Sequence, residues 1–163
     1  MTNITQTCAA LDRHGVMYEF EEHPAVMTID ECRLHQVDGK GMVLKNLFLR
    51  DRGGTRTFMF CCHGHKRADL KKLAQNLGVS KLTFASPEHL LSCTGLTPGA
   101  VSPLGLIFDT TRQVTLAFDS DLYGLTDKIG VHPGENTATV FLKFDALVRF
   151  LEEIGAEVVF VDN

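Results

Sequence analysis

The densest group of side chains that could do chemistry is the run Cys61-Cys62-His63-Gly64-His65. His63 and His65 would point to the same side of an extended chain and could chelate zinc together. A structural zinc site needs a second pair of ligands, however, and the sequence offers only Cys32 and His35 for it. We therefore interpret the run as a strand end with buried thiols and exposed imidazoles, and we expect no metal site.

Other patterns also fall short of ligand-binding motifs. Gly39-Lys40-Gly41 lacks the spacing of a phosphate-binding Walker loop. Asp119, Asp121 and Gly124 begin like a calcium loop, but Gly130 stands where the closing Glu should be. The sequence contains no Gly-x-Ser-x-Gly nucleophile elbow. Nothing in these patterns predicts a metal or an organic cofactor.

Basic residues are concentrated in one part of the chain, although the net charge is −4 at pH 7. Ten of the 16 Lys and Arg residues, but only two of the 20 Asp and Glu residues, lie between Lys40 and Lys81. Such a basic segment within an acidic protein is compatible with binding a few phosphates of a nucleic acid while limiting non-specific binding. An ordinary solvent-exposed surface that binds no nucleic acid would give the same count of basic residues. With no Trp and two Tyr, the chain is poorly equipped to bind single strands by base stacking.

Composition favours a soluble protein of the cytoplasm. Hydrophobic residues make up 44% and charged residues 22% of the chain, as in ordinary globular proteins. The five cysteines, two of them adjacent, make a poor disulfide framework and suit a reducing cytosol. Residues 1–15 lack the features of a signal peptide, and no apolar stretch is long enough to span a bilayer. We expect a cytoplasmic protein with no membrane partner.

The expected elements interleave irregularly, and no repeat or linker divides the 163 residues. Arg52-Gly53-Gly54 joins two strands into a hairpin, and Gly78 ends the clearest helix. We predict one α+β (mixed α/β) domain over residues 1–163, with a mixed, mostly antiparallel sheet flanked by helices. The predicted helices have their caps at Asn3, Thr28, Asp69, Ser86 and Asp145. The predicted strands cover residues 16–21, 42–50, 55–62, 82–84, 104–108, 113–118, 137–144 and 158–161.

Three segments taken in order are more specific than any single motif. They are Lys45-Asn46-Leu47-Phe48-Leu49-Arg50-Asp51, residues 69–77 followed by 81–88, and residues 94–106 with His132-Pro133-Gly134-Glu135-Asn136 downstream. Together they resemble the YbaK and prolyl-tRNA synthetase-associated editing family, most closely its freestanding members that deacylate alanyl-tRNA(Pro). The resemblance covers nearly the whole chain, and these positions show no departure from the family pattern.

This resemblance implies a hydrolase that cleaves the ester between an amino acid and the terminal adenosine of tRNA, with no cofactor. The expected partner is the acceptor end of tRNA(Pro), and a transient contact with prolyl-tRNA synthetase or an elongation factor is left open. Lys45 would contact a phosphate or the ribose, Asn46 would orient the 3′ end, and the backbone around Gly99 would hold the aminoacyl group. His132 would lie near the substrate as a catalytic or a binding group. The residues assigned to substrate binding are Lys66, Arg67, Ala100, Val101, Ser102 and Pro103.

The implied reaction is chemically modest. An aminoacyl ester is already activated, so positioning a water and stabilising the oxyanion suffice. A synthetase pocket built for proline excludes alanine poorly, because a missing methylene is worth only about 1–3 kcal/mol of discrimination. A second site sized for alanine would correct the error. Two alternatives stay open: a deacylase of the same fold for cysteine, serine, threonine or 2-aminobutyrate, and a non-catalytic tRNA-binding or regulatory module.

Overall fold

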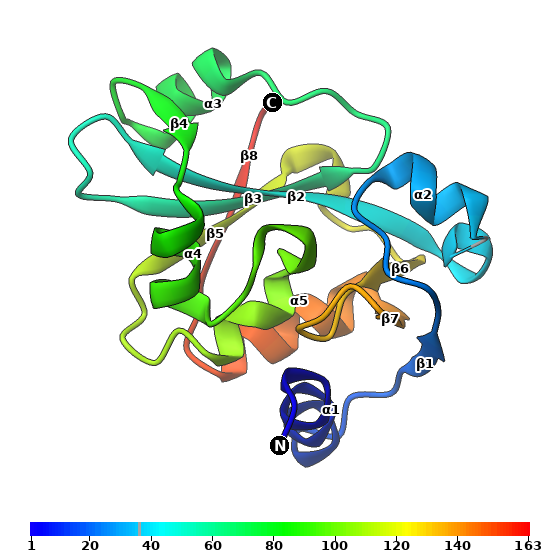
Figure 1. The fold of residues 1–163 in the computed structure, drawn as a ribbon. Coiled ribbons are helices and arrows are strands. Elements are labelled where there is room, and N and C mark those ends of the chain that lie inside the picture. The colour runs from blue at the N-terminus through cyan, green and yellow to red at the C-terminus, as the bar shows by residue number, and fades with distance from the viewer. Residues whose placement is uncertain (36) are drawn as a thin grey trace.

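The computed structural model describes residues 1–35 and 37–163 and confirms the predicted mixed α+β architecture. The strands form one eight-stranded sheet in the order β1-β7-β6-β2-β3-β5-β8, and β4 pairs with β2 beside this path (Figure 1). Four strand pairs are antiparallel and three are parallel. The strands are β1 (Glu19–Glu22), β2 (Met42–Asp51), β3 (Thr57–His63), β4 (Leu82–Phe84), β5 (Val114–Asp119), β6 (Lys128–Val131), β7 (Ala138–Lys143) and β8 (Glu157–Val161).

Five α-helices and four short 3₁₀ helices lie in the part of the chain that the structure describes. None of these helices is long and apolar enough to cross a membrane. The α-helices are α1 (Asn3–Arg13), α2 (Ile29–Leu34), α3 (Leu70–Leu77), α4 (Pro87–Thr94) and α5 (Phe144–Glu153). The 3₁₀ helices are η1 (Val37–Lys40), η2 (Pro98–Ala100), η3 (Pro103–Ile107) and η4 (Ser120–Leu122).

The centre of the sheet is buried on both faces. Parallel pairing joins β3 to β5 and β5 to β8, and such strands read as continuous apolar runs because helices cover both sides. Side chains alternate along β5, so Leu116 and Phe118 enter one core with Phe150 of α5. Ala117 enters the other core with Leu73 of α3. The sheet thus separates a large core under α5 from a smaller one under α3.

Strand β2 has different neighbours along its length. On one side it pairs with β3 from Leu44 to Arg50. On the other side β6 reaches only Met42 and Val43, and β4 begins only at Leu49. Residues 44–48 therefore have no strand on that side among the described residues. This leaves a gap in the sheet beside β2.

Most predicted helix boundaries are confirmed by their caps. The side chains of Thr28, Asp69 and Ser86 each accept a hydrogen bond from a backbone N–H in the first turn of α2, α3 and α4. Gly78 ends α3 with φ of 74°, a conformation that glycine adopts without strain. The cap of α1 is Thr2 instead of the predicted Asn3.

Two further expectations at element boundaries are corrected, and one strand was missed. The helix predicted to start after Asp145 begins at Phe144, and Lys143 is its cap residue without a side-chain bond. The first strand starts at Glu19, three residues later than predicted. Strand β6 was not anticipated, because it is only four residues long and has Gly130, a weak strand former, in its interior.

The strand predicted at residues 104–108 is wrong, because the segment from Pro103 to Ile107 forms the 3₁₀ helix η3. Ser102 caps this helix by accepting a hydrogen bond from Leu104 N at 3.2 Å. Pro103 fixes its own φ at a helical value in the first position. These local preferences outweigh the apolar character of the run, which had suggested a buried strand.

Replacing Phe118 by Ala should lower the free energy of unfolding by about 3–5 kcal/mol, because this fully buried ring fills the core under α5. The matched variant Phe84→Ala should change it by less than about 0.5 kcal/mol, because Phe84 is 65% exposed. Urea denaturation followed by circular dichroism measures both. Equal losses in the two variants would contradict this placement of the core.

Candidate active site

A cavity of about 290 Å³ opens at the gap beside β2. It is bounded by β2, by the segment leading into α2, by the loop around Gly99 and by the end of β6. Its lining residues are Val26, Met27, Thr28, Ile29, Cys32, Val43, Leu44, Lys45, Asn46, Leu47, Pro98, Gly99, Val101, Gly130, Val131, His132 and Thr139. Four residues of the predicted catalytic set, Lys45, Asn46, Gly99 and His132, are thus brought together from three separate parts of the chain.

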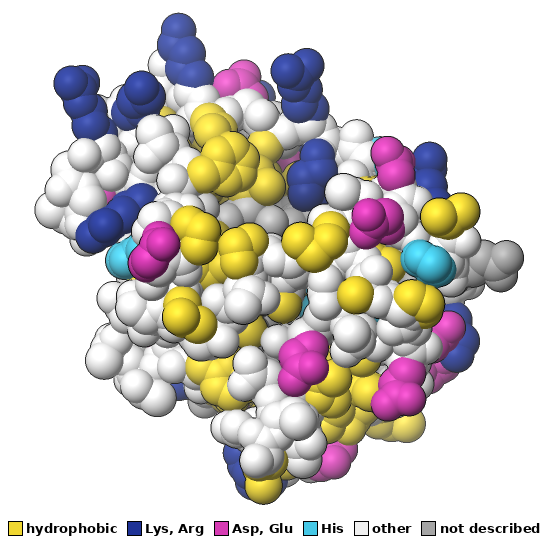
Figure 2. All heavy atoms as spheres, in the orientation of Figure 1, with side chains coloured by type: hydrophobic (Ala, Val, Ile, Leu, Met, Phe, Trp, Pro, Cys, Tyr) yellow, Lys and Arg dark blue, Asp and Glu magenta, His cyan; other side chains and the backbone are white. Residues whose placement is uncertain are grey.

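Lysine and arginine side chains visible in Figure 2 gather on the upper part of the face, over α3 and β4. This distribution agrees with the concentration of basic residues that the sequence places between Lys40 and Lys81. Acidic side chains are scattered over the same face. The molecule therefore has a local basic surface in spite of its net negative charge.

Lys45 extends from β2 to the cavity, and its ammonium group already makes one hydrogen bond within the protein. Lys45 Nζ donates a hydrogen bond of 2.6 Å to the carbonyl oxygen of Lys66. An ammonium group has three N–H donors, so two remain for other partners. This bond limits the motion of a long side chain that would otherwise sample many rotamers.

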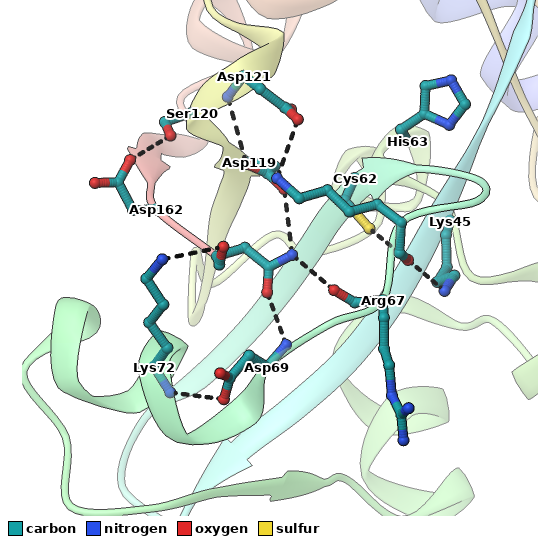
Figure 3. A network of polar contacts seen from close by, with 12 residues as sticks. Lys45, Cys62, His63, Arg67, Asp69, Lys72, Asp119, Ser120, Asp121 and Asp162 are labelled. Carbon is teal, nitrogen blue, oxygen red and sulfur yellow. Dashed lines mark hydrogen bonds and ion pairs between the residues drawn. The ribbon is translucent and has the colours of Figure 1, made fainter.

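Lys66 and Arg67, which we assigned to substrate binding, lie outside the cavity lining. Lys66 Nζ forms ion pairs with Asp119 Oδ2 at 2.6 Å and Asp121 Oδ2 at 3.0 Å. The hydrogen bond to Asp119 raises the pKa of Lys66 above its usual value. Arg67 is exposed, and in Figure 3 its guanidinium points away from the network around Asp119.

Asn46 connects β2 to the loop that follows η2. Its Nδ2 donates a hydrogen bond of 3.1 Å to the carbonyl oxygen of Val101. Its Oδ1 is buried and has no hydrogen-bond donor among the described residues. A buried acceptor without a partner is costly, so one placed in a cavity wall is a candidate contact for a ligand donor.

The loop at Gly99 forms one wall of the cavity, and neighbouring side chains already occupy the space beside the Gly99 Cα atom. A Cβ atom at Gly99 would lie 2.5 Å from Met27 Sδ and 3.1 Å from Asn136 Nδ2. The Asn136 side chain in turn donates to Val26 O at 3.0 Å and approaches Met27 Sδ at 3.2 Å. The thioether of Met27 therefore lies directly over the Gly99 backbone.

Only part of the predicted aminoacyl-binding loop faces the cavity. Val101 lines it beside Gly99, and Pro98 adds a residue that the sequence had not suggested. Ala100 is buried outside the lining. Ser102 and Pro103 are used to begin η3, so their contribution to the site is to fix the path of the loop.

His132 follows β6 and presents a neutral imidazole to the cavity. Its Nδ1 lies 2.9 Å from the carbonyl oxygen of Ala138, so Nδ1 carries the proton that is donated. Nε2 is then unprotonated in the neutral ring. Burial lowers the pKa of His132, an effect that the bond to Ala138 opposes and nearby His23 reinforces. The ring is suited to accept a proton or a hydrogen bond.

The run from Cys61 to His65 is a strand end of the kind predicted. Cys61 and Cys62 are fully buried, and His63 and His65 are exposed. Burial raises the pKa of Cys62 to about 11, so it is a thiol at neutral pH and a poor nucleophile. His65 Nε2 lies 2.9 Å from the guanidinium of Arg33. No group of three potential metal ligands is found among residues 1–35 and 37–163.

Several residues of the site carried no recognisable signal in the sequence. Met27 reads as an ordinary apolar residue, and His23 marks only the end of a strand before Pro24. In the structure, His23 Nδ1 donates to Pro24 O and His23 Nε2 accepts from the hydroxyl of Thr139, a cavity residue. The His-Pro dipeptide was the available clue, but nothing in the sequence related it to His132.

Comparison with known proteins gives a consistent result. The model of the aminoacyl-tRNA editing domain family matches residues 23–150. The chain is 37% identical over 147 residues to the prolyl-tRNA editing protein ProX of Acetoanaerobium sticklandii, covering 90% of this chain and 89% of the relative. It is 38% identical over 133 residues to the prolyl-tRNA synthetase associated domain-containing protein 1 of Danio rerio, covering 81% and 72%.

The fold is also found among solved structures. A crystal structure described as a candidate trans-editing enzyme for prolyl tRNA synthetase matches with a TM-score of 0.73 at 24% identity. The match covers 100% of this chain and 98% of that one. At this level of identity the comparison establishes the fold, over the whole length of this chain.

The imidazole of His132 should titrate below pH 6.5, because burial disfavours its charged form. The free energy of unfolding should accordingly decrease as the pH falls through this lowered pKa, with no such loss above about pH 6.5. Two-dimensional ¹⁵N NMR of the imidazole nitrogens measures the midpoint and shows whether Nδ1 carries the proton. A midpoint at or above 6.5 would contradict the placement, and His132→Ala identifies the signal.

Proposed function

Because the chain belongs to the aminoacyl-tRNA editing domain family, we propose that it hydrolyses mischarged alanyl-tRNA(Pro) in trans, releasing alanine and tRNA(Pro). The observation that carries this proposal is the small cavity in which Lys45, Gly99 and His132 meet. The naming of relatives for prolyl-tRNA editing supports tRNA(Pro) as the partner. A role in translation, with tRNA as substrate, also agrees with the cytoplasmic location that the composition favours.

The groups at the cavity wall are suited to hydrolysis by general-base catalysis. A water oxygen attacks the ester carbonyl, the bond to the ribose oxygen breaks, and the ribose oxygen takes up a proton. His132 Nε2 accepts a proton from the attacking water, because Nδ1 already donates to Ala138. The two remaining donors of Lys45 bind the phosphate or ribose of the terminal adenosine.

Backbone and amide groups complete the proposed site. N–H groups of the backbone near Gly99 stabilise the oxyanion, since the missing side chain allows a close approach. The buried Oδ1 of Asn46, which has no donor among the described residues, accepts a hydrogen bond from the α-ammonium group of the amino acid. Such contacts are stronger in a partly enclosed cavity than in open water, because the effective dielectric constant is lower there.

Met27 gives the cavity its size limit in this proposal. Its thioether fills the space over Gly99, so a side chain larger than that of alanine has to displace it. Discrimination by steric fit typically amounts to about 1–3 kcal/mol per methylene. Proline is excluded on this basis, whereas cysteine, serine and 2-aminobutyrate are close enough in size to be competing substrates.

The decisive experiment uses a panel of charged tRNAs in the presence of a chelator. The protein should release alanine from alanyl-tRNA(Pro) and leave prolyl-tRNA(Pro) intact. Lys45→Ala should lower the rate at least about 100-fold, because it removes a positioned charge at the substrate. The control Lys143→Ala, an exposed lysine on β7, should retain the wild-type rate.

Other outcomes of the panel separate the alternatives. Hydrolysis of cysteinyl-tRNA(Pro) or alanyl-tRNA(Ala) in preference to alanyl-tRNA(Pro) would keep the reaction and change the substrate. Binding of tRNA without release of any amino acid would favour a non-catalytic binding module and rule out the proposed hydrolase. The free amino acid is quantified with radiolabelled substrate.

Met27→Ala should lower the preference for alanyl-tRNA(Pro) over prolyl-tRNA(Pro) by about tenfold or more, because the cavity gains several heavy atoms' worth of space. The ratio of kcat/KM for the two substrates measures this. Stability should change little, since Met27 is 63% exposed. Met17→Ala is the matched control, because Met17 is exposed and lies outside the cavity lining. An unchanged ratio would show that Met27 does not limit the size of the substrate.

A further inference from the structure

The loop between β3 and α3 carries the carbonyl group that holds Lys45. Figure 3 shows Lys45 approaching this loop from β2, while Asp119 at the end of β5 and Asp121 in η4 approach it from another side. The Lys66 ammonium reaches both carboxylates, at 2.6 Å and 3.0 Å. Its own backbone N–H donates to His63 O at 2.9 Å. The residue is therefore fixed at both its side chain and its backbone.

Asn163 fixes the next peptide groups of the same loop. Its Nδ2 donates to Arg67 O at 3.0 Å, and its Oδ1 accepts from Asp69 N at 2.7 Å. The same Nδ2 lies 3.3 Å from Asp119 Oδ2. Asp119 is thus the common partner of the Lys66 ammonium and of the Asn163 amide that hold the loop.

Asp119 is an unusual residue in this network because its side chain is only 1% exposed. A buried carboxylate needs a partner that compensates for lost hydration, and the Lys66 ammonium is the cation that supplies it. The Lys66 side chain is itself only 33% exposed. The two carboxylates and the one ammonium together carry a net negative charge. A negatively charged cluster of this kind is a poor binding site for a phosphate.

We propose that the Lys66–Asp119 ion pair positions Lys45 for the hydrolysis of the aminoacyl ester. It fixes the carbonyl of Lys66, which takes one of the three ammonium donors of Lys45 at 2.6 Å and directs the other two toward the substrate. Lys66 is then a positioning residue that acts through its backbone. This proposal rests on the proposed function for its kinetic test and on the geometry of the free protein for a second one.

The kinetic test compares Lys66→Met, Asp119→Asn and the double variant that combines them. Each should lower kcat on alanyl-tRNA(Pro) about ten- to a hundredfold and change KM less than about threefold, because a misplaced group loses rate more than binding. In a Lys45→Ala background the same substitutions should cause no further loss, since their effect passes through Lys45. Lys66→Arg, which can keep the ion pair, should restore most of kcat.

A direct phosphate contact by Lys66 predicts the opposite pattern. Lys66→Met would then raise KM with kcat unchanged and reduce the salt dependence of tRNA binding by about one charge. Asp119→Asn would release the lysine and lower KM. Either result, or a further loss of rate from Lys66→Met in the Lys45→Ala background, overturns the proposal.

The double variant also guards against a trivial loss of folding. Lys66→Met alone leaves a buried carboxylate without its cation, which is destabilising, whereas Lys66→Met/Asp119→Asn removes both charges. Circular dichroism and urea denaturation check that the double variant is folded at the assay temperature. Lys143→Met is the matched control for loss of a lysine.

A second readout does not depend on activity. In protein labelled with ¹⁵N-lysine, the hydrogen-bonded ammonium of Lys45 should give a slowly exchanging ¹H–¹⁵N signal, identified by its absence in Lys45→Ala. The signal should broaden or disappear in Lys66→Met/Asp119→Asn and persist in Lys143→Met. An unchanged signal in the double variant overturns the proposal. If the wild-type protein deacylates no tRNA, the proposed function fails while this measurement still decides whether the ion pair positions Lys45.

Discussion

The site depends on the way β2 changes neighbours along its length. Among the described residues, β6 pairs with only its first two residues, β4 pairs with its last three, and the interval between them has a strand partner only in β3. A fully paired strand would place two neighbours against its edges and leave no space for a substrate. The interval instead brings Lys45 and Asn46 to the wall of a cavity. Because β3 continues along the other side, the strand stays rigid where the cavity opens.

Each candidate side chain in the cavity is held by a backbone carbonyl from another element. Lys45 donates to Lys66 O, Asn46 to Val101 O and His132 to Ala138 O. These bonds use one donor of each group and leave the remaining hydrogen-bonding capacity for a ligand. A site built in this way needs little reorganisation when the substrate binds, which is the usual source of electrostatic stabilisation in enzymes. It suits an activated ester, for which orientation matters more than a strong nucleophile.

The sequence was sufficient to predict those elements that depend on residues close together in the chain. The caps of α2, α3 and α4, the hairpin of β2 and β3, and the apolar β5 could all be predicted, because caps, turns and apolar runs act over a few residues. It was misleading at η3, where Ser102 and Pro103 outweigh an apolar run. It gave no indication of Met27 over Gly99 or of Asp119 beside Lys66, because these contacts join segments more than 50 residues apart. Such contacts arise from the register of the sheet, which periodicity alone does not specify.

The basic segment between Lys40 and Lys81 shows a similar difference. The number of basic residues in the sequence does not tell how many of them can contact a phosphate in the structure. Its ten cations suggest a large surface for phosphates. Lys66 is paired with two carboxylates, Lys40 is paired with Glu21 at 3.2 Å, and Arg50 donates to the backbone of Gly54. Only cations that neutralise phosphates contribute to the salt-dependent affinity for a nucleic acid. The formal charge of the segment is therefore an upper limit, and part of it stabilises the loop that holds Lys45. A deacylase must release its tRNA after each hydrolysis. Tighter binding of the tRNA would not raise kcat, because it would stabilise the substrate and the transition state alike.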